Sequence, residues 1–343
     1  MRAFDGLDKL VSGMPIVFGG DKFVRVSDGL AARFVAGDAL LVVPNRGEIL
    51  HVPKAVRELV STCVSRALDA FTALAHVDDA LISRFFVEFA TRLRDDELWQ
   101  RIERANQSDI HAAEKRGRST TRLRVSDSMR EAMIEGLRGW ASARSRRGEL
   151  LECVEHDEFA VELRGAALGV VGFVFEGRPN VLADATGVLR GGNAVVFRIG
   201  SDALGTAEAM MQHALTPSLL AAGLPEHAVV LIPSAEHAAG WSLFSDARLS
   251  LLVARGSGPA VADLGALARQ AGVPVSLHGT GGAWLFASSS ARADAFEAAL
   301  VRSLDRKVCN TLNTCCILRD QAARQLPWFL RALERAGERL GQP

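Results

Sequence analysis

A nearly continuous apolar run at residues 167–175 restricts the fold of this 343-residue chain more than any other stretch. A strand is apolar throughout only when both of its faces are covered, as in a parallel sheet. A second run of this kind covers residues 194–198, and the helical pattern of residues 181–190 lies between the two. This alternation predicts an α/β protein with parallel sheets.

The alternation continues to the end of the chain. Gly223-Leu224-Pro225 ends the helix expected at residues 203–222. We expect strands at residues 229–232, 249–253, 273–277, 283–287 and 315–318, and further helices at residues 258–271, 291–305 and 321–340.

The region before the first apolar run has two parts. Residues 1–53 predict a β-rich arm or module with strands at 15–18, 22–26, 39–43 and 48–52. We expect it to serve packing or oligomerisation, because no residue pattern in it indicates chemistry. Residues 53–146 have helical periodicity, and Ser126 is the expected N-cap of one helix.

Charge and composition exclude several classes of protein. The chain has 40 basic and 40 acidic residues, so it does not bind nucleic acid through bulk charge. The basic run Lys115-Arg116-Gly117-Arg118 is therefore interpreted as a solvated loop rather than a polyanion site. No apolar run is long enough to span a bilayer, and the first residues lack the pattern of a signal peptide.

Cysteine usage indicates a reducing compartment. The odd number of cysteines, five, and the adjacency of Cys315 and Cys316 argue against a disulfide framework, so we expect a cytoplasmic protein. No Cys-x-x-Cys pair or His/Cys cluster predicts a metal site.

Polar or glycine-containing loops follow four of the predicted strands. In open parallel sheets, ligands bind beyond the carboxyl ends of the strands. The Gly200-Ser201 pair precedes a predicted helix and offers backbone N–H groups to a phosphate. No G-x-G-x-x-G follows a strand, and glycine turns are common in any α/β protein, so each loop also has a purely structural interpretation. The four loops are residues 176–180, 198–202, 255–258 and 278–282.

Cys309 is the candidate nucleophile. Arg306 and Lys307 precede it, and nearby cations lower the pKa of a thiol and so raise its reactivity. Taken alone, a buried and inert cysteine at a turn is the simpler interpretation.

Three motifs together resemble the γ-glutamyl phosphate reductase family of the aldehyde dehydrogenase superfamily. Residues 168–181 resemble the family pattern L-G-V-I-G-V-I-Y-E-A-R-P-N-V, and Asp184 continues it. Residues 192–198 resemble G-N-A-V-I-L-R, and residues 308–312 resemble V-C-N-T-L. The resemblance covers residues 55 to 318 and includes the helical stretch with Asn106.

The resemblance implies an aldehyde-dehydrogenase-like fold with two parallel-sheet α/β domains. It implies a homo-oligomer that uses NADP(H) to reduce L-glutamate 5-phosphate to the semialdehyde through a thioester on Cys309. The expected parts are a β-rich arm at residues 1–53, an NADP-binding domain at 54–233, a catalytic domain at 234–320 and a C-terminal helix at 321–343.

The same resemblance implies roles for individual residues. Cys309 and Asn180 are catalytic, since the oxyanion needs hydrogen-bond donors such as the Asn180 side chain. The expected substrate-binding residues are Arg178, Arg255, Asn310 and Thr311, and the expected cofactor-binding residues are Glu176, Arg198, Gly200, Ser201 and Gly256.

The chain also departs from the family pattern. Asn313 replaces a glutamate near the nucleophile, and members normally continue well beyond the cysteine-containing strand, so the C-terminal part of the family fold is expected to be missing. Two alternative functions therefore stay open. In the first alternative, the chain is a reductase of another acyl phosphate or of an acyl-CoA. In the second, it is a non-catalytic relative that acts as a binding or scaffold subunit.

Overall fold

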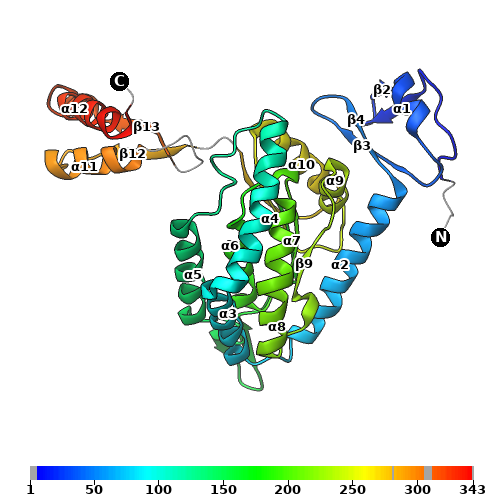
Figure 1. Cartoon of the computed structure of the whole chain (residues 1–343), viewed down its shortest axis with the longest axis horizontal. Helices are drawn as coiled ribbons and strands as arrows, with labels where there is room; N and C mark the ends of the chain where they lie inside the picture. Colours follow the sequence, from blue (N-terminus) through cyan, green and yellow to red (C-terminus); the bar gives the residue numbers. More distant parts are fainter. Residues whose placement is uncertain (1–5, 280–281, 305–310, 342–343) are drawn as a thin grey trace. The chain divides into compact units, whose positions relative to one another are not determined.

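The computed structural model of the chain describes residues 6–279, 282–304 and 311–341 (Figure 1). The predicted nucleophile Cys309 and its neighbour Asn310 lie outside the described residues. The chain forms two compact units. Unit 1 comprises Met1–Arg255 and Ala260–Leu277, and unit 2 comprises Gly256–Pro259 and His278–Pro343.

A five-stranded sheet is the centre of unit 1. Its order is β11-β10-β7-β8-β9, and β7 pairs in parallel with β8 and β10, as β8 does with β9. Every residue of β7 and β8 is buried, which confirms the sequence prediction that both faces are covered. The strands are β7 (Val170–Phe175), β8 (Ala194–Ile199), β9 (Val229–Leu231), β10 (Leu251–Arg255) and β11 (Val275–His278).

Helices connect these strands, as the alternation predicts. The connection from β7 to β8 is α6 (Val181–Ala185) followed by a 3-10 helix, η1 (Thr186–Gly191). In the connection from β8 to β9, Gly223 caps the last α-helix, α8, with a positive φ of 78°. That connection consists of η2 (Ser201–Ala203), α7 (Leu204–Met210), the π-helical η3 (Met211–Leu215), α8 (Thr216–Ala222) and η4 (Glu226–Ala228).

The chain then returns to the other side of β7. Helix α9 (His237–Phe244) leads to β10, and α10 (Gly258–Gln270) leads from β10 to β11. Helix α9 is absent from the sequence prediction. With right-handed crossovers, a sheet that grows first to one side and then to the other carries its connecting helices on opposite faces.

Four long helices precede the sheet and complete the core of unit 1. Phe85, Phe86 and Phe89 of α3 are fully buried, and α3 packs against α5. The Ser126 side chain accepts a hydrogen bond from the Met129 N–H at 3.2 Å, so Ser126 is the N-cap of α5 as predicted. The helices are α2 (Lys54–Leu74), α3 (Asp79–Arg94), α4 (Asp96–Lys115) and α5 (Asp127–Ser142).

The N-terminal segment forms two antiparallel pairs, β1 with β2 and β3 with β4. A short helix, α1 (Asp28–Arg33), lies between the pairs and is absent from the sequence prediction. The Asp38 carboxylate accepts hydrogen bonds from the Val35 and Lys54 N–H groups and lies 2.7 Å from His51 Nε2. Burial opposes ionisation of Asp38, but these bonds outweigh it and lower the pKa of the carboxyl. The strands are β1 (Pro15–Phe18), β2 (Lys22–Arg25), β3 (Ala39–Val43) and β4 (Glu48–Val52).

A second unpredicted feature is the hairpin of β5 (Leu150–Glu155) and β6 (Ala160–Arg164). All residues of both strands are exposed. Both strands expose large apolar side chains, among them Phe159, Val161 and Leu163.

Unit 2 contains the parallel pair β12 (Ala283–Ala287) and β13 (Leu312–Ile317) with α11 (Ala293–Ser303) and α12 (Ala322–Leu340). A 3-10 turn, η5 (Arg319–Gln321), joins β13 to α12. Leu285 packs in the small core of this unit, whereas Trp284 and Phe286 on the same strand are exposed and stack on each other.

The two units divide the chain at a different place from the predicted boundary at residue 233. Strands β10 and β11 join the sheet of β7, so residues 234–255 and 260–277 belong to unit 1. Strand-helix alternation runs without interruption across this region, and alternation does not reveal which strands share a sheet.

Candidate functional site

The order of strands defines where a ligand is expected in unit 1. The chain starts the sheet at β7, adds β8 and β9 on one side, and then adds β10 and β11 on the other. The connections therefore diverge beyond the carboxyl ends of β7 and β10, which is the usual ligand position in open parallel sheets. The Glu176 N–H donates a 3.2 Å hydrogen bond to the Arg255 carbonyl, so the loops after these two strands meet at this switch point.

The loop after β7 contains Glu176, Arg178 and Asn180. The Arg178 N–H donates to the Glu176 carbonyl at 2.8 Å, and this tight turn leads into α6. Asn180 is the N-cap residue of α6, and its Nδ2 lies 3.4 Å from Oδ2 of Asp184. A carboxylate only accepts hydrogen bonds, so it holds the amide nitrogen of Asn180 on its side.

Asp184 lies in this region too, although the sequence analysis names it only as part of the family motif and gives it no role. Its carboxyl is open to solvent on one side, but the protein around it partly desolvates it and raises its pKa, and the nearby charge of Arg255 opposes that rise. The spacing of one helical turn from Asn180 was the available signal, because residues i and i+4 of a helix lie on one face.

Arg255 is the last residue of β10 and is exposed. Its guanidinium carbon lies 5.8 Å from the centre of the Phe175 ring at the end of β7. Arg255 and the loop of Arg178 and Asn180 thus lie at neighbouring strand ends, as predicted for residues that contact one ligand.

Arg198, near the end of β8, is buried with 6% of its surface exposed. One guanidinium nitrogen, Nη2, donates to the Ala235 carbonyl at 2.7 Å, whereas Nε has no hydrogen-bond partner among the described residues. Burial lowers the pKa of this guanidinium. An unpaired donor on a buried cation is costly, and a bound anionic or polar ligand would satisfy it.

Gly200 follows β8 and lies against the loop that follows β7. A Cβ atom at Gly200 would lie 2.8 Å from the Gly177 nitrogen, so no larger residue fits without a backbone shift. Close backbone approach of this kind is typical of loops around a dinucleotide. Together with the unpaired Nε of Arg198, it makes the predicted cofactor-binding residues compatible with a phosphate-bearing dinucleotide.

Ser201 and Asp202 begin the helical connection after Gly200. Arg118 Nη1 lies 2.8 and 2.9 Å from the two carboxylate oxygens of Asp202 and 3.4 Å from Ser201 Oγ. Arg116 Nη2 lies 2.9 Å from Asp202 Oδ1. The basic run interpreted as a solvated loop therefore contacts η2, just after β8, and the sequence did not predict this contact.

The predicted site residues fall into both units. Glu176, Arg178, Asn180, Arg198, Gly200, Ser201 and Arg255 belong to unit 1. Gly256 and Thr311 belong to unit 2, in which the Gly256 N–H donates to the His278 carbonyl and the Thr311 carbonyl accepts from the Ala283 N–H. Asn313 is exposed on β13.

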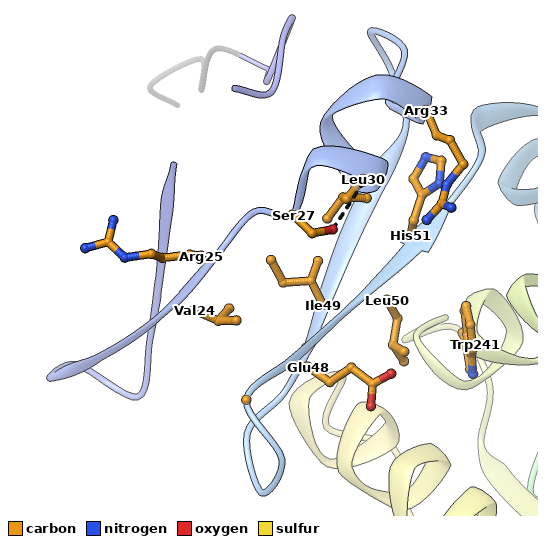
Figure 2. A pocket seen from close by; sticks show the side chains of 11 residues that line it. Val24, Arg25, Ser27, Leu30, Arg33, Glu48, Ile49, Leu50, His51 and Trp241 are labelled. Atoms are coloured by element: carbon orange, nitrogen blue, oxygen red, sulfur yellow. Dashed lines mark hydrogen bonds between the residues drawn. The ribbon is translucent and has the colours of Figure 1, made fainter. Parts of the chain in front are cut away.

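A separate cavity of about 500 Å³ lies between the N-terminal strands and α9 (Figure 2). Ile49, Leu50 and Trp241 line it, and Arg25 and Arg33 also border it, as Figure 2 shows. None of the predicted site residues lines this cavity. Its volume is that of a small-ligand pocket, but it does not lie at the carboxyl ends of the parallel strands.

Two features are absent from the residues that the structure describes. No helix in that part of the chain is long and apolar enough to cross a membrane. No group of three or more His, Cys, Asp or Glu side chains that the structure describes is placed to hold a metal ion.

Comparison with known proteins gives consistent results. The sequence model described as "Aldehyde dehydrogenase family" matches residues 41–320. Gamma-glutamyl phosphate reductase of Allorhizobium ampelinum is 33% identical over 243 residues, which are 68% of this chain and 56% of that protein. The enzyme of the same name from Mesorhizobium japonicum is 34% identical over 243 residues, again 68% of this chain and 56% of the relative.

Among solved structures, gamma-glutamyl phosphate reductase from Thermotoga maritima has a TM-score of 0.71 at 23% identity, over 81% of this chain and 68% of that chain. A lactaldehyde dehydrogenase has a TM-score of 0.61 at 18% identity, over 89% of this chain and 62% of that chain. These likenesses confirm the predicted α/β fold. The chain spans a little over half the length of the curated relatives named above.

Proposed function

The chain belongs to the aldehyde dehydrogenase family, and from this premise we propose that it is a cytoplasmic, homo-oligomeric reductase that converts L-glutamate 5-phosphate to the 5-semialdehyde with NADPH. The names of its relatives support this choice of substrate. The meeting of the loops after β7 and β10, joined by the bond from Glu176 to Arg255, is the structural observation that supports it most directly.

The proposed chemistry begins at Cys309. Its thiolate attacks the acyl carbon of the substrate, the bond to the phosphate oxygen breaks, and inorganic phosphate leaves a thioester on the enzyme. The proposed cofactor-binding residues, among them Arg198 and Gly200, would hold NADPH, which would supply the hydride that reduces this thioester. The resulting thiohemiacetal oxyanion collapses, the carbon–sulfur bond breaks, and the aldehyde leaves with the Cys309 thiolate restored.

Asn180 is proposed to stabilise the oxyanion of this sequence. Negative charge develops on the carbonyl oxygen, and a fixed amide N–H that points at this oxygen lowers the barrier. One Nδ2 hydrogen faces Asp184, which leaves the second free for the oxyanion.

Arg178 and Arg255 are proposed to hold the phosphate before it leaves. A guanidinium binds phosphate oxygens through two parallel N–H groups, which positions the anion as well as attracting it. Arg255 is exposed at its strand end, and its ring contact with Phe175 leaves its N–H groups available.

The segment around residues 277–282 is consistent with a reductase. Hydrolytic members of the family use a glutamate to activate water, and no glutamate occurs at Leu277-His278-Gly279-Thr280-Gly281-Gly282. A thioester that awaits reduction is protected when no base activates water beside it.

Replacement of Cys309 tests the proposal. We expect the Cys309→Ala variant to lose phosphate-dependent reduction of NADP by glutamate 5-semialdehyde, the reverse reaction, by at least about a thousandfold, because the covalent step is removed. Absorbance of NADPH measures the rate. Cys153→Ala, at an exposed cysteine of the hairpin, is the matched control and should retain turnover.

Three results would contradict the proposal. Unchanged turnover of Cys309→Ala would exclude the nucleophile. Turnover with an acyl-CoA but not with phosphate would point to the alternative reductase. An intact fold that binds no NADPH in calorimetry would point to a non-catalytic relative.

A further inference from the structure

Two arginines outside the central sheet reach the end of its second strand. Arg116 and Arg118 follow α4, and both contact the carboxylate of Asp202, where the chain leaves β8. About half of the Arg118 side chain and somewhat less of the Arg116 side chain is exposed, so both guanidinium groups are accessible to a ligand. The proposed mechanism uses neither arginine.

The loop that bears the arginines is fixed to the helix after β8. Asn106 of α4 is 1% exposed, and its Nδ2 donates to the Leu123 carbonyl at 2.7 Å and to Thr206 Oγ1 at 3.1 Å. Asp109 accepts from both the N–H and the hydroxyl of Thr206 at 2.7 Å. Figure 1 shows α4 alongside α7, in agreement with their contacts. The position of the arginines beside Asp202 is therefore set by buried polar bonds.

In doubly wound sheets, the residues that follow the second strand contact the ribose of the dinucleotide cofactor. A carboxylate after the second strand accepts the ribose 2′-hydroxyl of NAD, and an arginine there accommodates the 2′-phosphate of NADP. Strand β8 is second in the chain order of this sheet, and Asp202 follows it. Both oxygens of Asp202 already accept hydrogen bonds from Arg118, so this carboxylate is not a free acceptor for a ribose hydroxyl.

The charges around Asp202 favour an anion. Arg116 and Arg118 bring two positive charges to the single carboxylate of Asp202. A phosphate monoester carries nearly two negative charges at neutral pH, which matches the charge of the two arginines. Exposed ion pairs contribute little to stability, so a phosphate can replace Asp202 as the partner of the arginines at small cost.

We propose that Arg116 and Arg118 form the subsite that selects NADPH over NADH by binding the phosphate monoester on the ribose of the cofactor. The inference rests on the proposed function, because it specifies how that function's cofactor is recognised. Asp202 keeps the two guanidinium groups in place while the site is empty.

Calorimetric titration of the full chain with NADPH and with NADH tests the subsite. We expect the double variant Arg116→Ala/Arg118→Ala to bind NADPH about tenfold or more weakly, since two charge-assisted contacts are lost, with NADH affinity unchanged. Lys115→Ala is the matched control, because it removes one charge from the same run and has no described contact with Asp202. Its ratio of NADPH to NADH affinity should equal that of the unaltered chain.

A second variant is expected to increase the preference for NADPH over NADH. A destabilised protein would not produce such an increase, so this result cannot be mistaken for a folding defect. Asp202→Asn removes the internal competitor for both arginines and should increase the preference for NADPH over NADH severalfold. Higher salt should reduce this preference, because the arginines are exposed.

The outcomes separate the two proposals. If both dinucleotides bind and neither variant changes their affinity ratio, the subsite is overturned while the proposed function stands. If the unaltered chain prefers NADH, the subsite is also overturned. If neither dinucleotide binds a folded chain, both proposals fall.

Discussion

Arg198 is a buried cation whose Nε has no partner among the described residues. A protein optimised for stability alone would place an apolar side chain here, since an uncompensated buried charge is unfavourable. Its position near the end of β8, two residues before Gly200, fits the role in cofactor binding that we propose for it. Sites that bind ligands often lower the stability of the unoccupied protein in this way.

Replacement of Arg198 should separate stability from binding. We expect Arg198→Met to raise the thermal midpoint by about 2–4 °C, the shift that about 1 kcal/mol produces in a domain of this size, because the charge disappears while the volume is largely kept. NADPH affinity should fall in the same variant. Differential scanning calorimetry and titration measure the two effects. A lower midpoint with unchanged affinity would show that Arg198 is purely structural.

Asp184 should give the stability of the protein a distinctive pH dependence. Its carboxyl pKa is raised in the folded state, so the folded protein holds this proton more tightly than the unfolded chain does. The stability that the protonated Asp184 carboxyl contributes is complete below its ordinary pKa of 3.8. It is lost as the pH rises through the higher pKa of the folded protein. Asp184→Asn should remove this loss. The thermal midpoint of the variant should therefore rise relative to that of the unaltered chain as pH increases from 4 to 7.

The matched control for this experiment is Asp294→Asn, at a fully exposed carboxyl whose pKa is lowered by Arg292. The stability that this ionised carboxyl contributes is complete above its ordinary pKa of 3.8 and is lost only as pH falls below that value, so Asp294→Asn should shift the thermal midpoint by a nearly constant amount from pH 4 to 7. Equal pH profiles for the unaltered chain and Asp184→Asn would contradict the assignment.

At the scale of elements, α4 connects two parts of unit 1 through Asn106. This side chain donates to the Leu123 carbonyl and accepts from the Val125 N–H at 3.0 Å, and it also donates to Thr206. A buried amide with all of these partners fixes the α4–α5 connection and α7 with respect to each other.

Loss of this amide should be costly. We expect Asn106→Ala to lower the free energy of unfolding by about 2–4 kcal/mol, because buried backbone groups are left without partners. Urea denaturation followed by circular dichroism measures it. Gln107→Ala, at the exposed neighbouring position on the same helix, should change stability by less than about 0.5 kcal/mol. Similar effects of the two variants would contradict the role of Asn106.

The elements also show what the sequence could predict. Strands β7 and β8 are predictable because their side chains are almost all apolar. The end of α8 is predictable because a glycine, Gly223, readily adopts the left-handed conformation that ends a helix. The sequence prediction missed the hairpin β5–β6. The alternation of Phe159, Val161 and Leu163 with smaller or polar residues is short, and β5 has no such alternation. Helix α9 is short and apolar on nearly every side, so it lacks helical amphipathicity.

Part of the site was predictable from the geometry of parallel sheets. Loops after parallel strands meet at one edge of the sheet, so Arg178, Asn180 and Arg255 were expected to lie together. The contact of Arg116 and Arg118 with Asp202 was not predictable, because about 85 residues separate them and no periodicity relates a helix end to a distant strand end.

At the scale of the whole molecule, the β5–β6 hairpin is the surface that best fits the predicted homo-oligomer. Phe159, Val161 and Leu163 are 61%, 53% and 56% exposed on a two-stranded ribbon with open edges. Open edges and grouped apolar side chains are features of strands that pair with another chain. We expect a second copy of this chain to cover them.

A single charge should weaken that association. We expect Leu163→Asp to reduce the molar mass measured by light scattering toward that of one chain, since an unpaired carboxylate in an apolar interface is unfavourable. Leu220→Asp, at a leucine of α8 that is 57% exposed, is the matched control and should leave the mass unchanged. A single-chain mass for the unaltered protein would contradict the prediction.

The contact between Gly200 and Gly177 has a consequence for how this protein can evolve. Gly200 leaves room for the backbone of the loop after β7, because a Cβ at Gly200 would lie 2.8 Å from the Gly177 nitrogen. A Cβ at Gly177 would lie 3.3 Å from the side-chain Cβ of Asp202. We therefore expect changes in the two loops to be coupled, although 23 positions separate the glycines. An insertion or a bulkier residue in one loop should persist in a lineage only together with a compensating change in the other.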